Sequence, residues 1–414
     1  MTTLRGDINL LSIAHARDPY CSRLWATVLT NVDRMVRVRE PYGPRTRTIL
    51  VQPKSLSNFP MTESRPCHKL KGIQAFRGFA ILLIVMSHVV GRGFAFGGES
   101  GVCFFFVMSG FVLSMANDEK LRTGKFQTMR FVFHQLRKFY PLLALSLSFF
   151  VFAYWHAGYP VDYGKLLTNL LLIQTWFCSR HLVFSYVGSS WFLCDILVFY
   201  LFFKPLNRCI IGKSVKSLVL TWVAVVVIYA PFVFLIPSER FNYTLYSFPL
   251  FRLIDCCLGI ALYRFVMSGE GERLSEQMDK KAYGWQSLIL VVLLAFCLAF
   301  FAYRDVLPVN FRGVSFFWPF AFLFIISLMV IERSRPRFFS LPLVKIFTFL
   351  GDISMEMFLT HEIVIYVLNV VVAHYGLCRV HPLVLYAFYI VAIILFAWLA
   401  RLGLSRLLVK RVRI

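Results

Sequence analysis

Apolar residues occur in long stretches along most of the chain, separated by short polar segments. At about 1.5 Å of rise per residue, a helical stretch of this length spans most of the ~30 Å hydrocarbon core of a bilayer. The pattern therefore predicts an all-α, polytopic membrane helical bundle. Eleven apolar stretches can be delimited, near residues 73–90, 101–116, 139–156, 166–178, 189–206, 218–236, 248–267, 285–303, 314–331, 346–373 and 383–400.

The basic residues between these stretches indicate how many of them cross the membrane. Cytoplasmic loops carry an excess of Lys and Arg. The four basic loops and both termini can lie on this one side of the membrane only if one of the eleven stretches does not cross it. The shortest stretch, 166–178, is the best candidate. We therefore expect about ten transmembrane helices plus one short re-entrant or interfacial helix, with both termini in the cytoplasm. The basic loops are 118–138, 204–217, 268–284 and 332–345.

The same pattern divides the chain into three segments. Residues 1–60 are rich in Arg, are interrupted by prolines and lack a long apolar stretch, so we expect a mobile basic cytoplasmic tail. A wrongly assigned upstream start is the alternative for this segment. Residues 70–405 form the predicted membrane domain, and residues 406–414 form a second basic cytoplasmic tail.

The composition agrees with a membrane protein and bears on its partners. Hydrophobic residues make up 58% of the chain and charged residues only 16%, against about a quarter charged in soluble domains. The 44 Lys and Arg outnumber the 21 Asp and Glu, which gives a net charge of +23. Because the basic residues lie mostly in loops, we expect them to face anionic membrane lipids and not nucleic acid. The ten cysteines show no metal-binding spacing, so no metal site is predicted.

Two polar side chains share the first apolar stretch, Arg77 and His88, eleven positions apart. Eleven steps of about 100° return to nearly the same helix face, so both side chains point the same way, separated by about 16 Å along the axis. Such groups are costly inside a bilayer and tend to mark substrate or proton pathways. The structural alternatives are that Arg77 snorkels to the headgroups and that His88 bonds a backbone carbonyl. Their shared face favours a functional site.

Further segments carry a recognisable order of motifs. They are GVCFFFVMSGFVLS at 101–114, LRKFYPLL at 136–143, WFLCDILVFYLFFKPL at 191–206, FRLIDCCLGIALYR at 251–264 and LGDISMEMFLTHE at 350–362. With the spacing of Arg77 and His88, this set resembles the acyltransferase-3 family of integral-membrane O-acyltransferases, whose hallmark is an Arg or Lys and a His at that spacing. The resemblance extends over about residues 70–400.

The resemblance implies an enzyme that moves an acyl group, most simply acetyl, from acyl-CoA to a hydroxyl of a cell-surface or lipid-linked carbohydrate. His88 is then the expected general base or transient acyl carrier, with Arg77 beside it in the catalytic site. No tightly bound cofactor is implied, and the expected location is a bacterial cytoplasmic (inner) membrane. Many relatives carry a soluble esterase-like domain after the last span, whereas this chain, which ends at Ile414, is expected to stand alone.

Five more residues are candidates for substrate binding. Arg137 and Lys138 lie at the predicted cytoplasmic end of a helix, where cations suit the phosphates of coenzyme A. Ser109 either contacts substrate or permits close helix packing. Trp191 either lines the site or anchors a helix end at the membrane interface. His361 either contacts the substrate or acyl group or makes a structural hydrogen bond.

Other arrangements define the alternatives. Arg252 and Asp255, three positions apart, favour a structural ion pair within the membrane. His361 and Glu362 begin the zinc-protease pattern HExxH, but Ile365 stands where the second histidine ligand belongs, so a metalloprotease is not expected. A multi-span transporter or exporter of a lipid-linked glycan is the main alternative function, and an inactive scaffold subunit is the third.

Overall fold

The computed structural model describes residues 70–90, 97–210, 214–279, 291–292, 295, 309–312, 315–334, 340–375 and 380–411. The predicted tail 1–60 lies outside this part. The described residues contain helices and no strand. The longer helices are α3 (Lys71–Val90), α4 (Gly97–Arg122), α5 (Thr128–His156), α6 (Tyr163–Leu170), α8 (Trp191–Cys209), α9 (Val215–Leu235), α10 (Pro249–Val266), α11 (Gly269–Asp279), α14 (Trp318–Ser334), α15 (Pro342–Asp352), α16 (Ser354–His374) and α17 (Pro382–Arg411).

Short helical turns complete the described elements. One of them, η3 with 4 residues, and the helix α6 with 8 residues overlap the stretch 166–178. Neither is long enough to cross a bilayer, in agreement with the expectation that this stretch does not span it. The turns are η3 (Gln174–Phe177), α7 (Arg180–Val183), η4 (Gly188–Ser190), η5 (Ser238–Tyr243), α13 (Val309–Arg312) and η6 (Ser315–Phe317).

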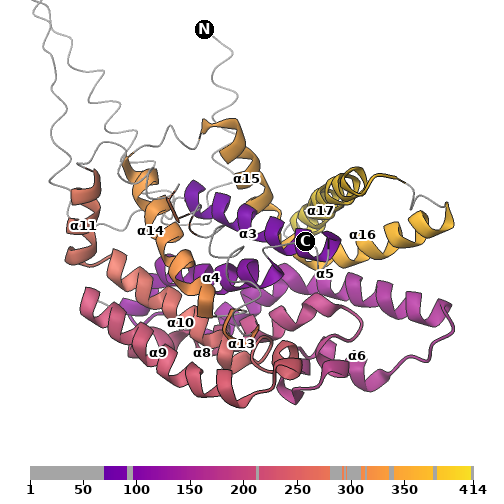
Figure 1. Ribbon diagram of the computed structural model, residues 1–414, viewed down its shortest axis with the longest axis horizontal. Helices are drawn as coiled ribbons and strands as arrows, with labels where there is room; N and C mark the ends of the chain where they lie inside the picture. The colour runs from indigo at the N-terminus through magenta and orange to yellow at the C-terminus, as the bar shows by residue number, and fades with distance from the viewer. Residues whose placement is uncertain are drawn as a thin grey trace, which may run out of the picture. The chain divides into compact units, whose positions relative to one another are not determined.

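The predicted all-α, polytopic membrane architecture is confirmed. Among the described residues, seven helices are long and apolar enough to cross a membrane, namely α3, α4, α5, α8, α9, α16 and α17. Two more predicted spans form the shorter or more charged helices α10 and α14 (Figure 1). The stretch 285–303 lies almost entirely outside the described residues, so a total of ten crossings stays a prediction. Helix α17 continues to Arg411 and thus includes part of the predicted C-terminal tail.

One predicted span is wrong in its continuity. The stretch 346–373 is not a single helix, because α15 ends at Asp352, Ile353 leaves the helical conformation with φ −104° and ψ 12°, and α16 begins at Ser354. Helix α15 packs mainly against α3, whereas α16 packs against α17 and α5 as well as against α3 (Figure 1). The break lets the two segments follow different neighbours.

Close backbone contacts hold α3 against α15. A Cβ atom added to Gly78 would overlap the carbonyl oxygen of Phe347, and one added to Gly351 would overlap the carbonyl oxygen of Gln74. Helices in lipid gain little from hydrophobic burial against one another, so small residues that allow close packing stabilise their association. The two glycines therefore set the position of α3, which carries Arg77 and His88.

A second glycine contact joins α4 to α10. A Cβ atom on Gly110 would overlap the carbonyl oxygen of Cys256, and one on Gly259 would overlap that of Val107. Larger side chains fill the space where helices lie farther apart. The ring of Phe76 on α3 lies with its centroid 5.0 Å from that of Phe104 on α4. Small residues at the crossings and aromatic rings between them thus build the core.

We predict that Gly351→Ala destabilises the protein. The added methyl group meets a backbone carbonyl, which cannot rotate away, so the cost should reach the upper part of the ~1–3 kcal/mol typical of overpacking. Thermal unfolding of the detergent-solubilised protein measures it. Gly403→Ala on α17 is the matched control, because open space surrounds a Cβ atom at that position. Equal midpoints for the two variants would contradict the close crossing.

Candidate active site

His88 and His361 meet at the contact of α3 with α16. Their ring centroids lie 4.8 Å apart. His361 is fully buried, whereas His88 is exposed, so the pair lies where the protein interior opens to the surroundings. The prediction that His88 shares α3 with Arg77 is confirmed, and the structure adds a second histidine beside it.

The hydrogen bonds of His361 determine its tautomer. Its Nδ1 atom lies 2.8 Å from the carbonyl oxygen of Phe358 and 3.2 Å from that of Met357. A carbonyl oxygen only accepts hydrogen bonds, so Nδ1 carries the proton and donates it, which leaves the lone pair on Nε2. Within the described part of the chain, the buried Nε2 atom has no hydrogen-bond partner. An acceptor without a donor therefore lies beside His88.

A carboxylate, Glu362, completes this group. Its Oε2 atom accepts a hydrogen bond of 2.8 Å from the backbone N–H of Gly188 in η4. One nitrogen of each histidine and one oxygen of Glu362 all lie within 4.8 Å of one another. We call His88, His361 and Glu362 the histidine–carboxylate site.

The sequence did not predict that Glu362 belongs to this site. Neighbouring residues on a helix point about 100° apart, so its position beside His361 gave no reason to place it near His88. A carboxylate within an apolar helix was the one signal that could have found it. The hydrogen-bond donor of Glu362 is the backbone N–H of Gly188, which is far from Glu362 in the sequence.

The histidine–carboxylate site contains the donor types that bind zinc. The Nε2 lone pair of His361, the ring of His88 and an oxygen of Glu362 would be the ligands. Ligands of a tetrahedral zinc ion at about 2.0–2.1 Å lie roughly 3.3 Å apart, so separations of up to 4.8 Å would have to contract. The expectation that the chain holds no metal stays a prediction.

Arg77 lies farther along α3, in a second polar region. It is half-buried, and its guanidinium carbon lies 5.9 Å from the centroid of the Phe105 ring. The charge of Glu356 on α16 and that of Asp352 at the end of α15 attract it. Arg401 on α17 is near the same groups, because its charge acts on Glu356 and its guanidinium donates a hydrogen bond to the backbone carbonyl oxygen of Asp352. Arg77 thus faces neighbouring helices.

Lys138 lies within electrostatic range of Arg77, and the two like charges repel each other. It is exposed, and its Nζ atom donates a hydrogen bond of 3.1 Å to Oε1 of Gln135. Arg137 is exposed on the same helix. No contact described for Arg137 connects it with Arg77, so the structure brings only one of the two predicted cations toward this arginine.

Ser109 is occupied within its own helix. Its hydroxyl donates a hydrogen bond of 2.7 Å to the carbonyl oxygen of Phe105, one turn earlier. The adjacent Gly110 makes the close contact with α10 described above. These observations favour the packing alternative for this part of α4.

Trp191 is buried at the start of α8. Only 5% of it is exposed, and its ring centroid lies 4.8 Å from that of Tyr246 and 6.5 Å from that of Phe106. This burial among aromatic rings favours a role inside the helical bundle over that of an interfacial anchor, whose indole would face the membrane surface. The apolar stretch in the sequence did not show whether Trp191, near its first residue, is buried in the protein or lies at the surface.

The predicted ion pair between Arg252 and Asp255 is confirmed. Their Nη1 and Oδ2 atoms are 3.1 Å apart, and both side chains are fully buried. The Nε1 atom of Trp318 donates a hydrogen bond to Oδ1 of Asp255. The guanidinium also lies over the ring of Tyr246, at 5.4 Å from its centroid. Asp195 on α8 is buried within range of the same arginine.

Taken together, the apolar helices and the buried polar groups define an integral, multi-pass membrane protein with a titratable site inside its helical bundle. A family model described as an acyltransferase domain matches residues 70–402. Since this match covers most of the chain, the chain belongs to the acyltransferase-3 family, and it is an acyl-transferring enzyme of the membrane. No curated protein and no solved structure matches it in the same comparisons.

We predict that Asp255→Asn destabilises the protein by about 3 kcal/mol, because it leaves Arg252 charged, buried and without its partner. The asparagine keeps an oxygen for the Trp318 hydrogen bond, so the change removes mainly the charge. Because Asp195 also lies near Arg252, the destabilisation should fall at the lower end of the ~3–5 kcal/mol typical of a broken buried ion pair. Thermal unfolding in detergent is the measurement. Arg122→Ala, which breaks the more exposed pair with Asp118, should cost less than about 1 kcal/mol. A reversed order would refute the assignment.

Proposed function

We propose that the chain transfers an acyl group, acetyl in the simplest case, from acyl-CoA to a hydroxyl of a cell-surface or lipid-linked carbohydrate. The family match supports acyl transfer. The observation that carries the finer proposal is the histidine–carboxylate site, in which His88 is exposed beside an acceptor nitrogen of His361. The protein would act in a bacterial inner membrane, with both termini in the cytoplasm, among lipids and without nucleic acid.

His88 serves as the general base in this proposal. Nε2 of His361 accepts a hydrogen bond from one ring nitrogen of His88, directly or through one water. The other ring nitrogen then presents its lone pair to the acceptor hydroxyl. As the hydroxyl loses its proton to His88, its oxygen attacks the thioester carbonyl and the coenzyme A sulfur leaves. An oxygen of Glu362, within 4.8 Å of the histidine nitrogens, is near enough to stabilise the imidazolium, and the proton then passes to the departing thiolate.

Arg77 binds the donor in the same scheme. A guanidinium grips phosphate oxygens bidentately, and Lys138 adds a second cation in range. The rise of about 16 Å from Arg77 to His88 along α3 is comparable to the length of an extended pantetheine arm. The nucleotide head would then lie at Arg77 while the thioester reaches His88.

Transient acylation of His88 is the alternative route. The imidazole nitrogen would attack the thioester, coenzyme A would leave, and the acyl group would pass from His88 to the acceptor hydroxyl. Incubation with labelled acetyl-CoA in the absence of acceptor distinguishes the routes. A covalent label on the peptide that contains His88 supports the carrier, and its absence in an active enzyme supports the base.

We predict that His88→Ala lowers acyl transfer by about 10²–10⁴-fold, the usual contribution of a general base. Release of free coenzyme A from labelled acetyl-CoA and label on the carbohydrate are the two readouts. His374→Ala is the matched control, because His374 is exposed at the end of α16 and should leave both readouts unchanged. Normal transfer by His88→Ala would end the proposal, and a wild-type protein that never releases coenzyme A would favour the exporter alternative.

We predict that Arg77→Gln raises the KM for acetyl-CoA by about tenfold or more, because a charge-assisted hydrogen bond to phosphate contributes about 1.5–3 kcal/mol. The rate at saturating donor should change less, since the acceptor hydroxyl still meets His88. Steady-state kinetics in detergent measure both constants. Lys125→Gln removes an exposed cation from the segment between α4 and α5 and should have no effect. An unchanged KM in Arg77→Gln would show that Arg77 does not hold the donor.

A further inference from the structure

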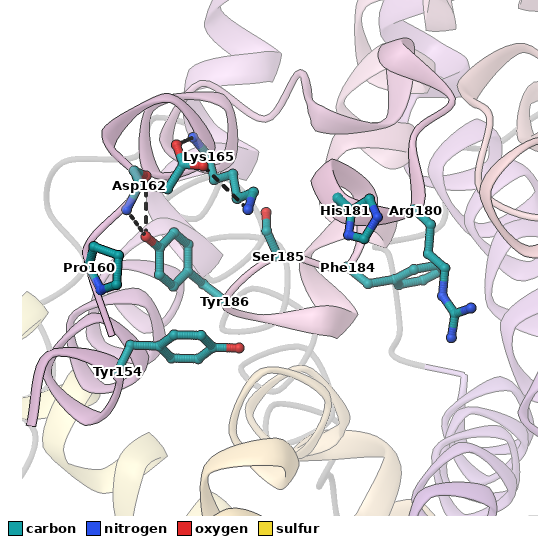
Figure 2. Close-up of a pocket in the computed structure, with 9 residues that line it drawn as sticks. All are labelled: Tyr154, Pro160, Asp162, Lys165, Arg180, His181, Phe184, Ser185 and Tyr186. Carbon is teal, nitrogen blue, oxygen red and sulfur yellow. Dashed lines mark hydrogen bonds and ion pairs between the residues drawn. The ribbon is translucent and has the colours of Figure 1, made fainter. Parts of the chain in front are cut away.

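A pocket between the end of α5 and the segment 160–186 lies outside the sites described so far. Its volume is about 320 Å³, near the lower end of the ~300–1,000 Å³ range of ligand pockets, so it suits a small ligand. Figure 2 shows that its lining combines aromatic rings with charged side chains. The residues that matter for its chemistry are Tyr154, Asp162, Lys165, Arg180, His181 and Tyr186.

Two tyrosines form an aromatic wall of this pocket. The ring centroids of Tyr154 and Tyr186 lie 5.5 Å apart, edge to face. The hydroxyl of Tyr186 donates a hydrogen bond to the carbonyl oxygen of Asp162 and accepts one from its N–H, at 3.2 and 2.9 Å. These bonds fix the Tyr186 ring, while Tyr154 is exposed. Aromatic side chains of this kind give apolar contact area with a polar tip, which suits a sugar ring with its C–H face and its hydroxyls.

The charges of the pocket leave one cation free to bind an anion. The backbone N–H of Lys165 donates to the Asp162 carboxylate and lowers the pKa of that group, so it stays ionised. The same carboxylate lies 3.3 Å from Nζ of Lys165, and the two charges compensate each other. In the described part of the chain, no hydrogen bond or ion pair involves the exposed Arg180 guanidinium. The pocket therefore favours a ligand that carries a negative charge.

The backbone around the pocket is held in unusual conformations. Leu172, Cys178 and Tyr186 have φ values of 54°, 47° and 53°, and they are the non-glycine residues with positive φ among those described. Such conformations cost free energy and cluster at functional sites. Buried hydrogen bonds stabilise the segment, including one of 2.7 Å from Asn169 to the hydroxyl of Ser185. The pocket is thus preformed.

The same segment connects the pocket to the histidine–carboxylate site. Tyr186 lines the pocket, and Gly188, two residues later, donates its N–H to Glu362. By contrast, Tyr154 lies 16 positions beyond Lys138 on α5, about 24 Å along the helix axis. One wall of the pocket is therefore two residues from the hydrogen-bond partner of Glu362, and Tyr154 is far along α5 from Lys138, which is proposed to hold the nucleotide of the donor.

We propose that this pocket binds an acidic sugar of the acceptor carbohydrate, with Tyr154 and Tyr186 against the ring and Arg180 on the carboxylate. This inference rests on the proposed function and names the substrate class of the same site. A bound sugar extends along the segment 186–188 toward His88, so that a hydroxyl of a neighbouring sugar residue meets the base. Specificity for the acceptor then lies in residues that take no part in the chemistry.

Binding of methyl β-glucuronide to the full chain in neutral detergent tests the proposal without acyl-CoA. Saturation-transfer NMR should detect the glucuronide, and methyl β-glucoside, which lacks the carboxylate, should bind at least about tenfold more weakly. Arg180→Ala should weaken glucuronide binding by a similar factor. Tyr154→Ala should weaken both sugars, while Tyr154→Phe, which keeps the ring, should bind nearly as the wild type does.

The matched control is Arg130→Ala, an exposed arginine near the other end of α5, which should leave binding unchanged. Equal binding of the two sugars, or Arg180→Ala that binds as well as the wild type, would overturn the proposal. Stronger competition by glycerol 3-phosphate than by the glucuronide would overturn it in favour of a lipid headgroup. Coenzyme A release by the wild type is measured separately. A protein that releases coenzyme A but does not bind the glucuronide contradicts only the sugar-binding proposal, whereas one that releases none contradicts the proposed enzymatic function.

Discussion

The close backbone crossing of α3 with α15 is the contact on which the arrangement of the site depends. Gly78 and Gly351 bring the two helices together so tightly that neither position has room for a side chain. In a bilayer, where burying apolar surface between helices gains little, such packing supplies much of the specificity. Since Arg77 and His88 both extend from α3, the crossing sets the position of both polar regions at once.

Some polar groups inside the bundle have partners on another helix or on their own helix. Glu332 of α14 accepts the N–H groups of Lys71 and Gly72 at 2.6 and 2.8 Å, which caps the start of α3. Arg252 has its carboxylate and its aromatic rings. The Nε2 atom of His361 is one of several buried polar atoms without a hydrogen-bond partner among the described residues, and a buried acceptor without a donor is costly unless a ligand or a second group uses it. It lies next to His88.

The two polar regions of α3 have different surroundings, and only the one with the histidines leads to the aromatic pocket. Acidic and basic groups from α15, α16 and α17 surround Arg77, whereas the histidines meet the segment that leads to the aromatic pocket. In the proposed scheme both substrates carry negative charge and both meet a cation, but only the acceptor pocket adds the two tyrosine rings that suit a sugar. Under that proposal the donor head lies at Arg77 and the acceptor sugar beyond the histidines, so that one base, His88, meets both substrates.

Periodicity and apolar length were enough to predict the membrane class, most helix positions and the common face of Arg77 and His88, because these depend on spacing along one helix. They did not reveal the break at Ile353, because the apolar residues on both sides of Gly351, Asp352 and Ser354 form one long apolar stretch in the sequence. The meeting of His88 with His361, and of Glu362 with Gly188, joins segments far apart in the chain. Only the tertiary structure decides such contacts, because helix crossings and loop paths are set by the packing of the whole bundle and leave no local pattern in the sequence.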